Sequence, residues 1–281
     1  MDLTFFQAAL FFYLAASIGY VFFLFNSSSK IASISSIFCL FGLGLQCLSF
    51  IIRSVVYCFF PLGTYFDALS FLAWLIIGLF IVLERRLSVP VLGSVAAPLA
   101  AGIMLLGATF SYQARGQVVP ILHSWWLPIH VIFALAGNAV FALMAVGGIL
   151  YIFQEWLIKG KRIRRLHRLL PSLETLDKMN RHGLPLGFCL LTVGILSGAL
   201  WANSAWGQYW SWDPKETWSL ITWFTYAAMV HQRIVLGWRG KKAALLAIIG
   251  FVLVMFTFVG ASTLLGGHHS ISGPDGGASQ T

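Results

Sequence analysis

The chain has 281 residues, of which 59% are hydrophobic and only 10% are charged, and its mean hydropathy is +0.84. A soluble domain carries about 25% charged residues, so this composition excludes the soluble classes and indicates an integral membrane protein. The formal net charge is +9, and the basic residues cluster in short segments between apolar runs. This pattern favours membrane topology and anionic lipid, and not nucleic acid, as the reason for the charge.

Long apolar runs predict membrane-spanning helices, since a span needs about 20 predominantly apolar residues. Eight runs satisfy this rule, and they lie at residues 4–25, 31–52, 65–83, 90–110, 129–153, 184–204, 217–236 and 243–263. The predicted fold class is therefore all-α: a polytopic integral membrane protein with an eight-helix transmembrane domain over residues 1–265 and an external tail over 266–281. The first basic residue is Lys30, so we expect the first span to be retained and not cleaved as a signal peptide.

The basic residues predict the orientation of these spans. They concentrate in three connections: a long one between the fifth and sixth spans, Arg239 to Lys242, and Arg85 with Arg86. With eight spans all three connections lie on one face, and the positive-inside rule makes that face cytoplasmic. Both termini and the connection between the sixth and seventh spans are then expected outside.

The connection between the sixth and seventh predicted spans is rich in tryptophan. This tryptophan-rich segment, residues 201–218, is expected to form an external loop, and it contains Trp201, Trp206, Trp210, Trp212 and Trp218 together with Gly207 and Asp213. Such a loop presents a flat, apolar, π-rich face, which suits a large planar ligand better than a small polar one. A simpler interpretation stays open, because tryptophan also collects at membrane interfaces without any ligand.

The end of this segment also has the sequence of a helix start. Asp213 is a favourable N-cap, Pro214 suits the first helical position, and Glu216 can reach back to the N–H of the cap residue. Asp213 and Glu216 are therefore interpreted mainly as groups that order the loop, and no catalytic residue is assigned.

Two histidine positions are expected at the level of the tryptophan-rich segment. His130 lies at the outer start of the fifth span, and His268 and His269 follow the eighth span. Neutral imidazole is a common metal ligand, and two imidazoles on either side of an aromatic platform can bind a haem iron axially. For each histidine alone, a polar side chain at the interface without a ligand is the simpler interpretation.

His231 differs from these residues because it lies within the seventh predicted span, toward its cytoplasmic half. An ionisable group inside a span is costly and marks a ligand or a pathway by default. The alternative is a hydrogen bond to a neighbouring helix or a place at the interface near Arg233. No other histidine lies at that depth inside a predicted span, so this chain offers no evident opposite ligand for His231.

These residues resemble the CcsA (ResC) family of cytochrome c biogenesis proteins, which belongs to the haem-handling membrane proteins with a tryptophan-rich WWD domain. The matching segments are Trp206 to Trp218 (WGQYWSWDPKETW), Leu122 to Val131, the downstream His231, and Gly266 to Ser270. The resemblance covers the third to eighth spans by motif and the first two by topology only.

The resemblance implies haem handling for the maturation of c-type cytochromes by system II. Members of this family work with a CcsB (ResB) membrane partner to carry haem b to the outer face and present it to the CxxCH motif of apocytochrome c for thioether attachment. The chain is then a component of a holocytochrome c synthase, or haem lyase, and thiol-reducing proteins are further expected partners. The implied location is the bacterial cytoplasmic membrane, with the thylakoid membrane as the alternative.

The implied site residues follow from the matched positions. His130 and His269 become the outer axial ligands, and His231 becomes a ligand whose opposite number comes from the partner. The haem platform is then formed by Trp206, Gly207, Trp210, Trp212, Asp213 and Trp218. Two rivals stay open: His268, because the family tail usually reads Gly-Leu-His-Ser-Tyr with a single histidine, and His123, which lies shortly before His130.

Other function classes are also considered from the sequence. A haem-delivery chaperone would transfer haem without attaching it. A b-type electron-transfer cytochrome would need histidine pairs inside facing helices, whereas only His231 lies well inside a predicted span. A structural membrane protein would use the tryptophans as anchors and would not copurify with haem. For the haem propionates Arg115 is a candidate on the outer side, and no residue is assigned.

Overall fold

The computed structural model describes residues 2–57, 62–110, 124–160 and 169–261. Every regular element within these ranges is a helix, which confirms the all-α prediction. In chain order the elements are α1 (Asp2–Asn26), α2 (Ser29–Tyr57), α3 (Tyr65–Leu87), the short 3-10 helix η1 (Pro90–Leu92), α4 (Gly93–Ala108), α5 (Trp126–Lys159), α7 (Leu173–Trp206), α8 (Pro214–Ile234), α9 (Lys241–Met255) and the π-helical turn η3 (Phe256–Gly260).

Seven helices in the described ranges are long and apolar enough to cross a membrane, so the chain is a multi-pass membrane protein. They correspond to all the predicted spans except 217–236. That segment forms α8, a helix of 21 residues, which is about 30 Å long at 1.5 Å per residue. Charged and polar residues at both ends of α8 lower its hydropathy. The eighth crossing, and with it the sidedness of the bundle, therefore stay predictions.

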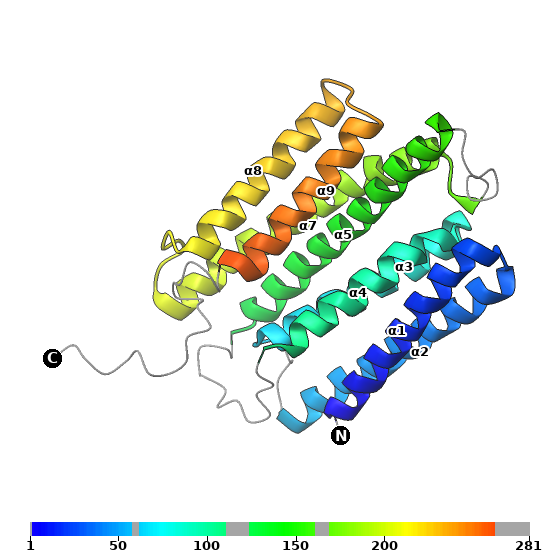
Figure 1. Ribbon diagram of the computed structural model, residues 1–281. Coiled ribbons are helices and arrows are strands. Elements are labelled where there is room, and N and C mark those ends of the chain that lie inside the picture. Colours follow the sequence, from blue (N-terminus) through cyan, green and yellow to red (C-terminus); the bar gives the residue numbers. More distant parts are fainter. Residues whose placement is uncertain (1, 58–61, 111–123, 161–168, 262–281) are drawn as a thin grey trace.

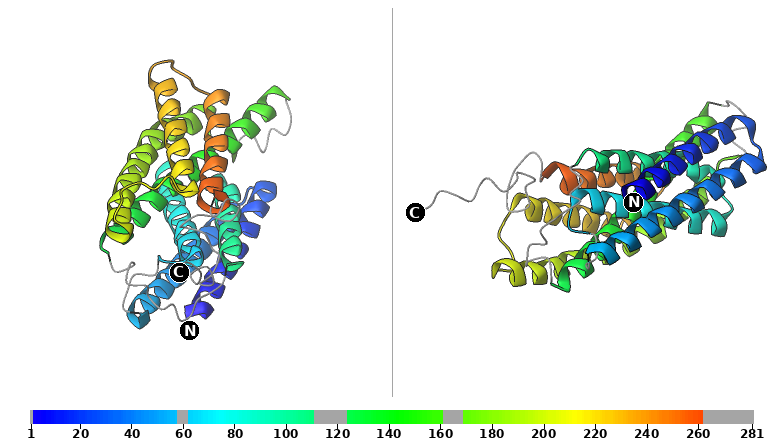
Figure 2. Two further views of the ribbon diagram at one scale, coloured as in Figure 1. Left: turned by 90° about the vertical axis from the view of Figure 1, so that its left-hand side faces the viewer. Right: turned by 90° about the horizontal axis from the view of Figure 1, so that it is seen from below.

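The helices lie roughly side by side in one bundle (Figure 1). The α1–α2 hairpin lies at one side against α4, the helices α3, α4 and α5 follow, and α7, α8 and α9 form the other side. Figure 2 shows the same bundle from two further directions. We call the end that carries residues 207–213 the tryptophan end, and the end that carries residues 235–240 the basic end.

Helix α7 begins earlier than the predicted span at 184–204. Its N-cap is Ser172, whose hydroxyl oxygen accepts a hydrogen bond from the backbone N–H of Thr175 at 3.1 Å. A serine cap satisfies one of the N–H groups that a helix start leaves without a partner. Part of the predicted long connection before the sixth span is therefore helical.

Helix α7 also ends later than expected, because it continues to Trp206. Gly207 then ends the helix with a φ of 75°, in the left-handed region that glycine enters without steric cost. The expected external loop over residues 201–218 is thus a connection of residues 207–213 between two helices. Gly207 itself is exposed, so its observed role is to end the helix.

Small residues bring α5 and α7 into close contact. A Cβ added at Gly194 would lie 2.9 Å from the backbone nitrogen of Ala134, and one added at Gly137 would lie 3.1 Å from the carbonyl oxygen of Gly187. Glycine at such positions lets two helix backbones approach closely, as at many helix interfaces in membranes. This contact places the start of α5 beside the last turns of α7 at the tryptophan end.

Candidate functional site

The described residues form a cavity at the tryptophan end. Its walls come from the starts of α3, α5 and α8, the last turns of α7, the connection 207–213, and the chain around η3. Its volume of about 270 Å³ lies just below the roughly 300–1,000 Å³ of small-molecule sites, which are likewise lined mainly by apolar and aromatic side chains. The cavity therefore has the lining of a ligand site and a volume close to that of the smallest ones.

His130 lies near the start of α5 and lines this cavity. Its Nδ1 is 2.7 Å from the carbonyl oxygen of Gly194 on α7. Because a carbonyl can only accept, Nδ1 carries a proton in this contact, and in the neutral form of the ring Nε2 is then the acceptor nitrogen. Metal-ligating histidines commonly have this arrangement, in which the other ring nitrogen donates to a backbone carbonyl. The ring also lies against Gly198, where an added Cβ would be 2.7 Å from Nδ1.

Three tryptophans share the cavity wall with His130. They are Trp201, Trp206 and Trp210. The rings of Trp201 and Trp206 meet edge to face with their centroids 4.9 Å apart, so the last turn of α7 presents a joined aromatic surface. The structure therefore brings together three of the predicted site residues, namely His130, Trp206 and Trp210.

Two other predicted tryptophans do not line the cavity within the described part of the chain. Trp212 is 70% exposed. The ring of Trp218 packs edge to face on Phe256 with centroids 4.7 Å apart, and its carbonyl accepts a hydrogen bond from the Thr222 hydroxyl at 2.8 Å. Thr222 is in turn 2.7 Å from Thr257 in the π-helical turn, so Trp218 helps to join α8 to η3.

The indole nitrogen Nε1 of Trp210 is buried and has no hydrogen-bond partner among the described residues. An indole N–H is a donor only, and a buried donor without an acceptor costs about 1–3 kcal/mol. Native structures keep few such groups, and each calls for an explanation such as a ligand or water. Trp210 also lines the cavity, so this N–H is a donor near the site that lacks an acceptor in the described part of the chain.

The acidic residues of the tryptophan-rich segment order the backbone. Asp213 is buried, and its Oδ1 accepts the N–H of Lys215 at 2.8 Å, which confirms the predicted cap of α8. Glu216 also orders this segment, through a partner that the sequence did not predict. Its Oε2 accepts the N–H and the hydroxyl of Ser211, at 2.7 and 3.0 Å. The backbone turn at Trp212, with a φ of 59°, separates Ser211 from the helix start.

The cavity wall also carries a cationic group that was not predicted from the sequence. The ammonium of Lys215 lies 5.3 Å from the ring centroid of Tyr65 and 5.8 Å from that of Phe258, and all three residues line the cavity. The lysine could have been noticed as the one cation within residues 201–218. No motif links it to Tyr65 or Phe258, which come from α3 and η3.

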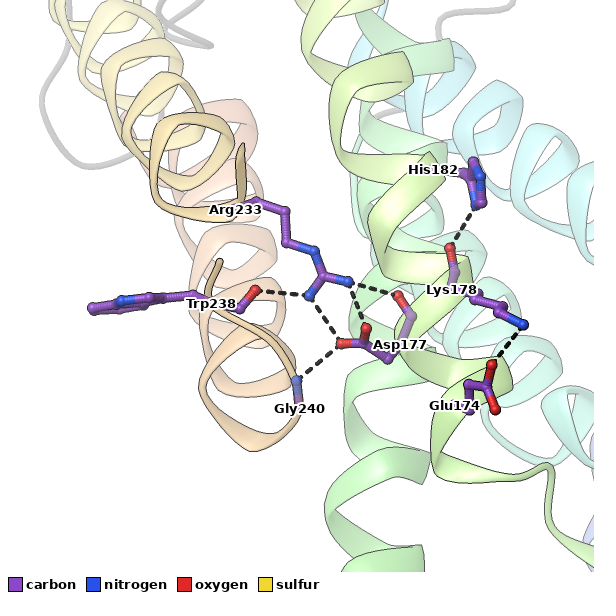
Figure 3. Close-up of polar contacts among 7 residues, drawn as sticks. All are labelled: Glu174, Asp177, Lys178, His182, Arg233, Trp238 and Gly240. Atoms are coloured by element: carbon purple, nitrogen blue, oxygen red, sulfur yellow. Dashed lines mark hydrogen bonds and ion pairs between the residues drawn. The ribbon is translucent and has the colours of Figure 1, made fainter. Parts of the chain in front are cut away.

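His231 lies at the other end of α8, in its last turn, and is exposed. Near it the guanidinium of Arg233 binds the carboxylate of Asp177 on α7 at 2.6 and 2.9 Å (Figure 3). Asp177 also accepts the N–H of Gly240, and Arg233 donates to the carbonyl of Trp238. We call this set of contacts the Asp177–Arg233 clasp. It joins α7 to the α8–α9 connection, and the structure does not bring His231 to the cavity.

Four residues considered from the sequence lie outside the described residues: His269, His268, His123 and Arg115. The role of His269 as the second outer ligand therefore stays a prediction.

The sequence of this chain is similar to those of known proteins. A family model described as cytochrome C assembly protein matches residues 62–269, which include every element of the cavity. The cytochrome c biogenesis protein CcsA of Chlorella vulgaris is 36% identical over 266 residues, covering 82% of this chain and 84% of that protein. The CcsA protein of Synechocystis sp. is 34% identical over 269 residues, covering 75% of this chain and 80% of that protein.

A solved structure shows a similar fold. Cytochrome c Heme Lyase CcmF superimposes with a TM-score of 0.63 at 16% sequence identity. The match covers 98% of this chain and 47% of the lyase, so this chain spans about half the length of that protein. On the family model and the CcsA relatives, this chain belongs to the cytochrome c assembly protein family, and its role lies in the maturation of c-type cytochromes.

Proposed function

We propose that this chain binds haem b in the cavity at the tryptophan end and presents it for thioether attachment to the CxxCH motif of an apocytochrome c. The observation that carries this proposal is the placement of His130 in the cavity wall. Its Nδ1 donates to the Gly194 carbonyl at 2.7 Å, so in the neutral ring Nε2 is the lone-pair nitrogen, which is the form that an iron ligand needs. The ring packs against Gly198, where a side chain would collide with it.

The other cavity residues support a large planar ligand. Trp201, Trp206 and Trp210 supply aromatic surface on the side of the cavity formed by the end of α7 and the connection that follows it. Such surface excludes water from the porphyrin, and the exclusion of water protects a reduced iron from side reactions. The second outer ligand in this proposal is His269, in the chain that follows η3.

The attachment step uses proximity more than acid–base catalysis. The histidine of the CxxCH motif replaces one protein ligand on the iron and brings the two adjacent thiols beside the vinyl groups. Each thioether forms when a thiol S–H adds across a vinyl double bond, so no external oxidant is needed. Asp213 and Glu216 hold backbone and hydroxyl groups, which supports their assignment as ordering groups and not as acids.

The proposal includes a membrane partner and a location. His231 is exposed in the last turn of α8, where a CcsB-type partner can supply the opposite ligand to a haem on its way across. The cavity then faces outward from a bacterial cytoplasmic membrane, or into the lumen from a thylakoid membrane. Thiol-reducing proteins keep the two cysteines of the substrate reduced.

The test is a maturation assay in a bacterium without its own c-type cytochrome pathway. The full chain, a CcsB-type partner and a reporter apocytochrome c are produced together, and covalently bound haem is measured by peroxidase staining of denaturing gels. His130→Ala is expected to lower holocytochrome by at least about tenfold, as for the loss of a metal-site group, with partial recovery on added imidazole.

His182→Ala is the matched control, because Nδ1 of His182 is likewise bonded to a backbone carbonyl, that of Lys178 at 2.8 Å, at a distance from the cavity. Unchanged holocytochrome with His130→Ala would contradict the proposal. If the wild-type chain binds haem but yields no holocytochrome, the chain delivers haem and does not take part in its attachment.

A further inference from the structure

The wall of the cavity at the start of α8 carries a positive charge that has no counter-ion among the described residues. Lys215 is half-buried, and its ammonium lies over the rings of Tyr65 and Phe258 at 5.3 and 5.8 Å. Ring faces attract a cation but do not replace a carboxylate. Within the described ranges no acidic side chain forms an ion pair with this lysine. An anion bound in the cavity could therefore pair with the ammonium of Lys215.

The nearest acidic groups are already engaged. Glu216 also lines the cavity, but its Oε2 accepts two hydrogen bonds from Ser211. Asp213 is turned toward the backbone N–H of Lys215. Both carboxylates reduce the positive potential of this wall. The start of α8 opposes them, because a helix of 21 residues carries a partial positive charge at its first turn.

A second, independent observation also indicates an acceptor ligand at this wall. Nε1 of Trp210 is buried without a partner in the described structure, and Trp210 and Lys215 line the same cavity. An indole N–H donates to oxygen acceptors and cannot accept. A cation and a donor together match a carboxylate, which accepts charge-assisted hydrogen bonds at both oxygens.

We propose that Lys215 and the Trp210 indole form a carboxylate subsite that binds the propionate groups of haem and so sets the orientation of the ring in the cavity. This inference rests on the proposed haem site. Two adjacent pyrrole rings of haem b carry the propionates, and the other two carry the vinyl groups. The carboxylates and the vinyl groups therefore lie on opposite sides of the macrocycle. Holding the carboxylates at the start of α8 therefore turns the vinyl groups away from this wall, toward the incoming thiols.

The experiment compares two probes on the full chain purified in mild detergent: iron protoporphyrin IX and its dimethyl ester, which keeps the iron and ring but lacks the carboxylates. The wild type is expected to bind the free acid about tenfold or more tightly than the ester, as for the loss of a charge-assisted hydrogen bond. In Lys215→Gln and in Trp210→Phe the two probes are expected to bind with nearly equal affinity.

Matched controls use the same residue types away from the subsite. Lys242→Gln removes a lysine that also lies over a ring, that of Trp238 at 5.1 Å, and Trp74→Phe changes a tryptophan of α3 that does not line the cavity. Both controls are expected to keep the preference for the free acid.

The outcomes separate this inference from the proposed function. If the wild type binds both probes equally through His130, the haem site stands and the carboxylate subsite is wrong. If the wild type binds neither probe, the proposed function itself fails. Because the comparison of probes on the wild type needs no variant, a folding defect in Lys215→Gln does not prevent the test.

Discussion

The two ends of α8 differ in whether nearby charged and donor groups have partners. At the basic end the charges of Asp177 and Arg233 are paired with each other, and each also bonds to the backbone of the α8–α9 connection. At the tryptophan end Lys215 has no paired carboxylate and the Trp210 N–H has no acceptor among the described residues. Paired charges therefore join the helices at the basic end, whereas the proposed haem site lies at the end where these two donors lack such partners in the described structure.

The largest expected effect comes from breaking the closed end. Asp177→Ala removes the carboxylate that Arg233 binds, at a site where the two side chains are only 20% and 11% exposed. An uncompensated charge in such a partly buried pair is expected to lower the free energy of unfolding by about 2–3 kcal/mol. Denaturant unfolding of the chain in detergent measures the change.

The control for this prediction lies one turn away on the same helix. Glu174→Ala removes an ion pair with Lys178 whose side chains are 75% and 63% exposed. Its expected effect is below about 0.5 kcal/mol. Equal losses in the two variants would show that the Asp177–Arg233 clasp is not the closing contact.

An intermediate effect is expected where α7 positions His130 at the open end. Gly198→Ala places a Cβ 2.7 Å from Nδ1 of His130, so the ring must move and the bond to Gly194 is strained. We expect haem affinity, measured by titration of the apoprotein, to fall about tenfold, as for loss of a histidine-orienting contact. Gly102→Ala is the control, because nothing lies within 4 Å of a Cβ at that position. Equal haem affinities in the two variants would show that Gly198 does not position His130 for haem binding.

The smallest effect concerns the connection that carries Trp210. Ser211→Ala removes the hydroxyl that donates to Glu216 at 3.0 Å but leaves the backbone N–H bond at 2.7 Å. The free energy of unfolding is expected to fall by about 0.5–1 kcal/mol. Thr217→Val deletes a long contact of 3.4 Å to the Trp212 carbonyl and should change little. A larger loss in Thr217→Val would mean that Glu216 does not order this connection.

The sequence predicted the elements of this fold better than their ends. Apolar runs predict spans because a bilayer needs them, and Asp213 with Pro214 predicts the start of α8 from local capping chemistry. Trp201 and Trp206 were expected in a loop but lie in α7. Tryptophan density does not distinguish a loop from a helix end, since the ring suits the membrane interface in either backbone state.

The cavity was predicted only in part, because its contacts depend on how distant segments pack. His130 was identified as a candidate from its position beside an expected span, but its bond to Gly194 follows from the close contact of α5 with α7. Lys215, Tyr65 and Phe258 meet across three elements. No spacing along the chain encodes that meeting.

The most direct test of haem binding at the open end is the visible spectrum of the full chain, purified in mild detergent with a CcsB-type partner. Wild type, His130→Ala and His182→Ala are compared with and without imidazole. Haem ligation by His130 predicts a low-spin bis-histidine b-type spectrum in the wild type and in His182→Ala, weakened in His130→Ala and restored by imidazole. A wild type without haem, or a His130→Ala spectrum identical to the wild type, would contradict it.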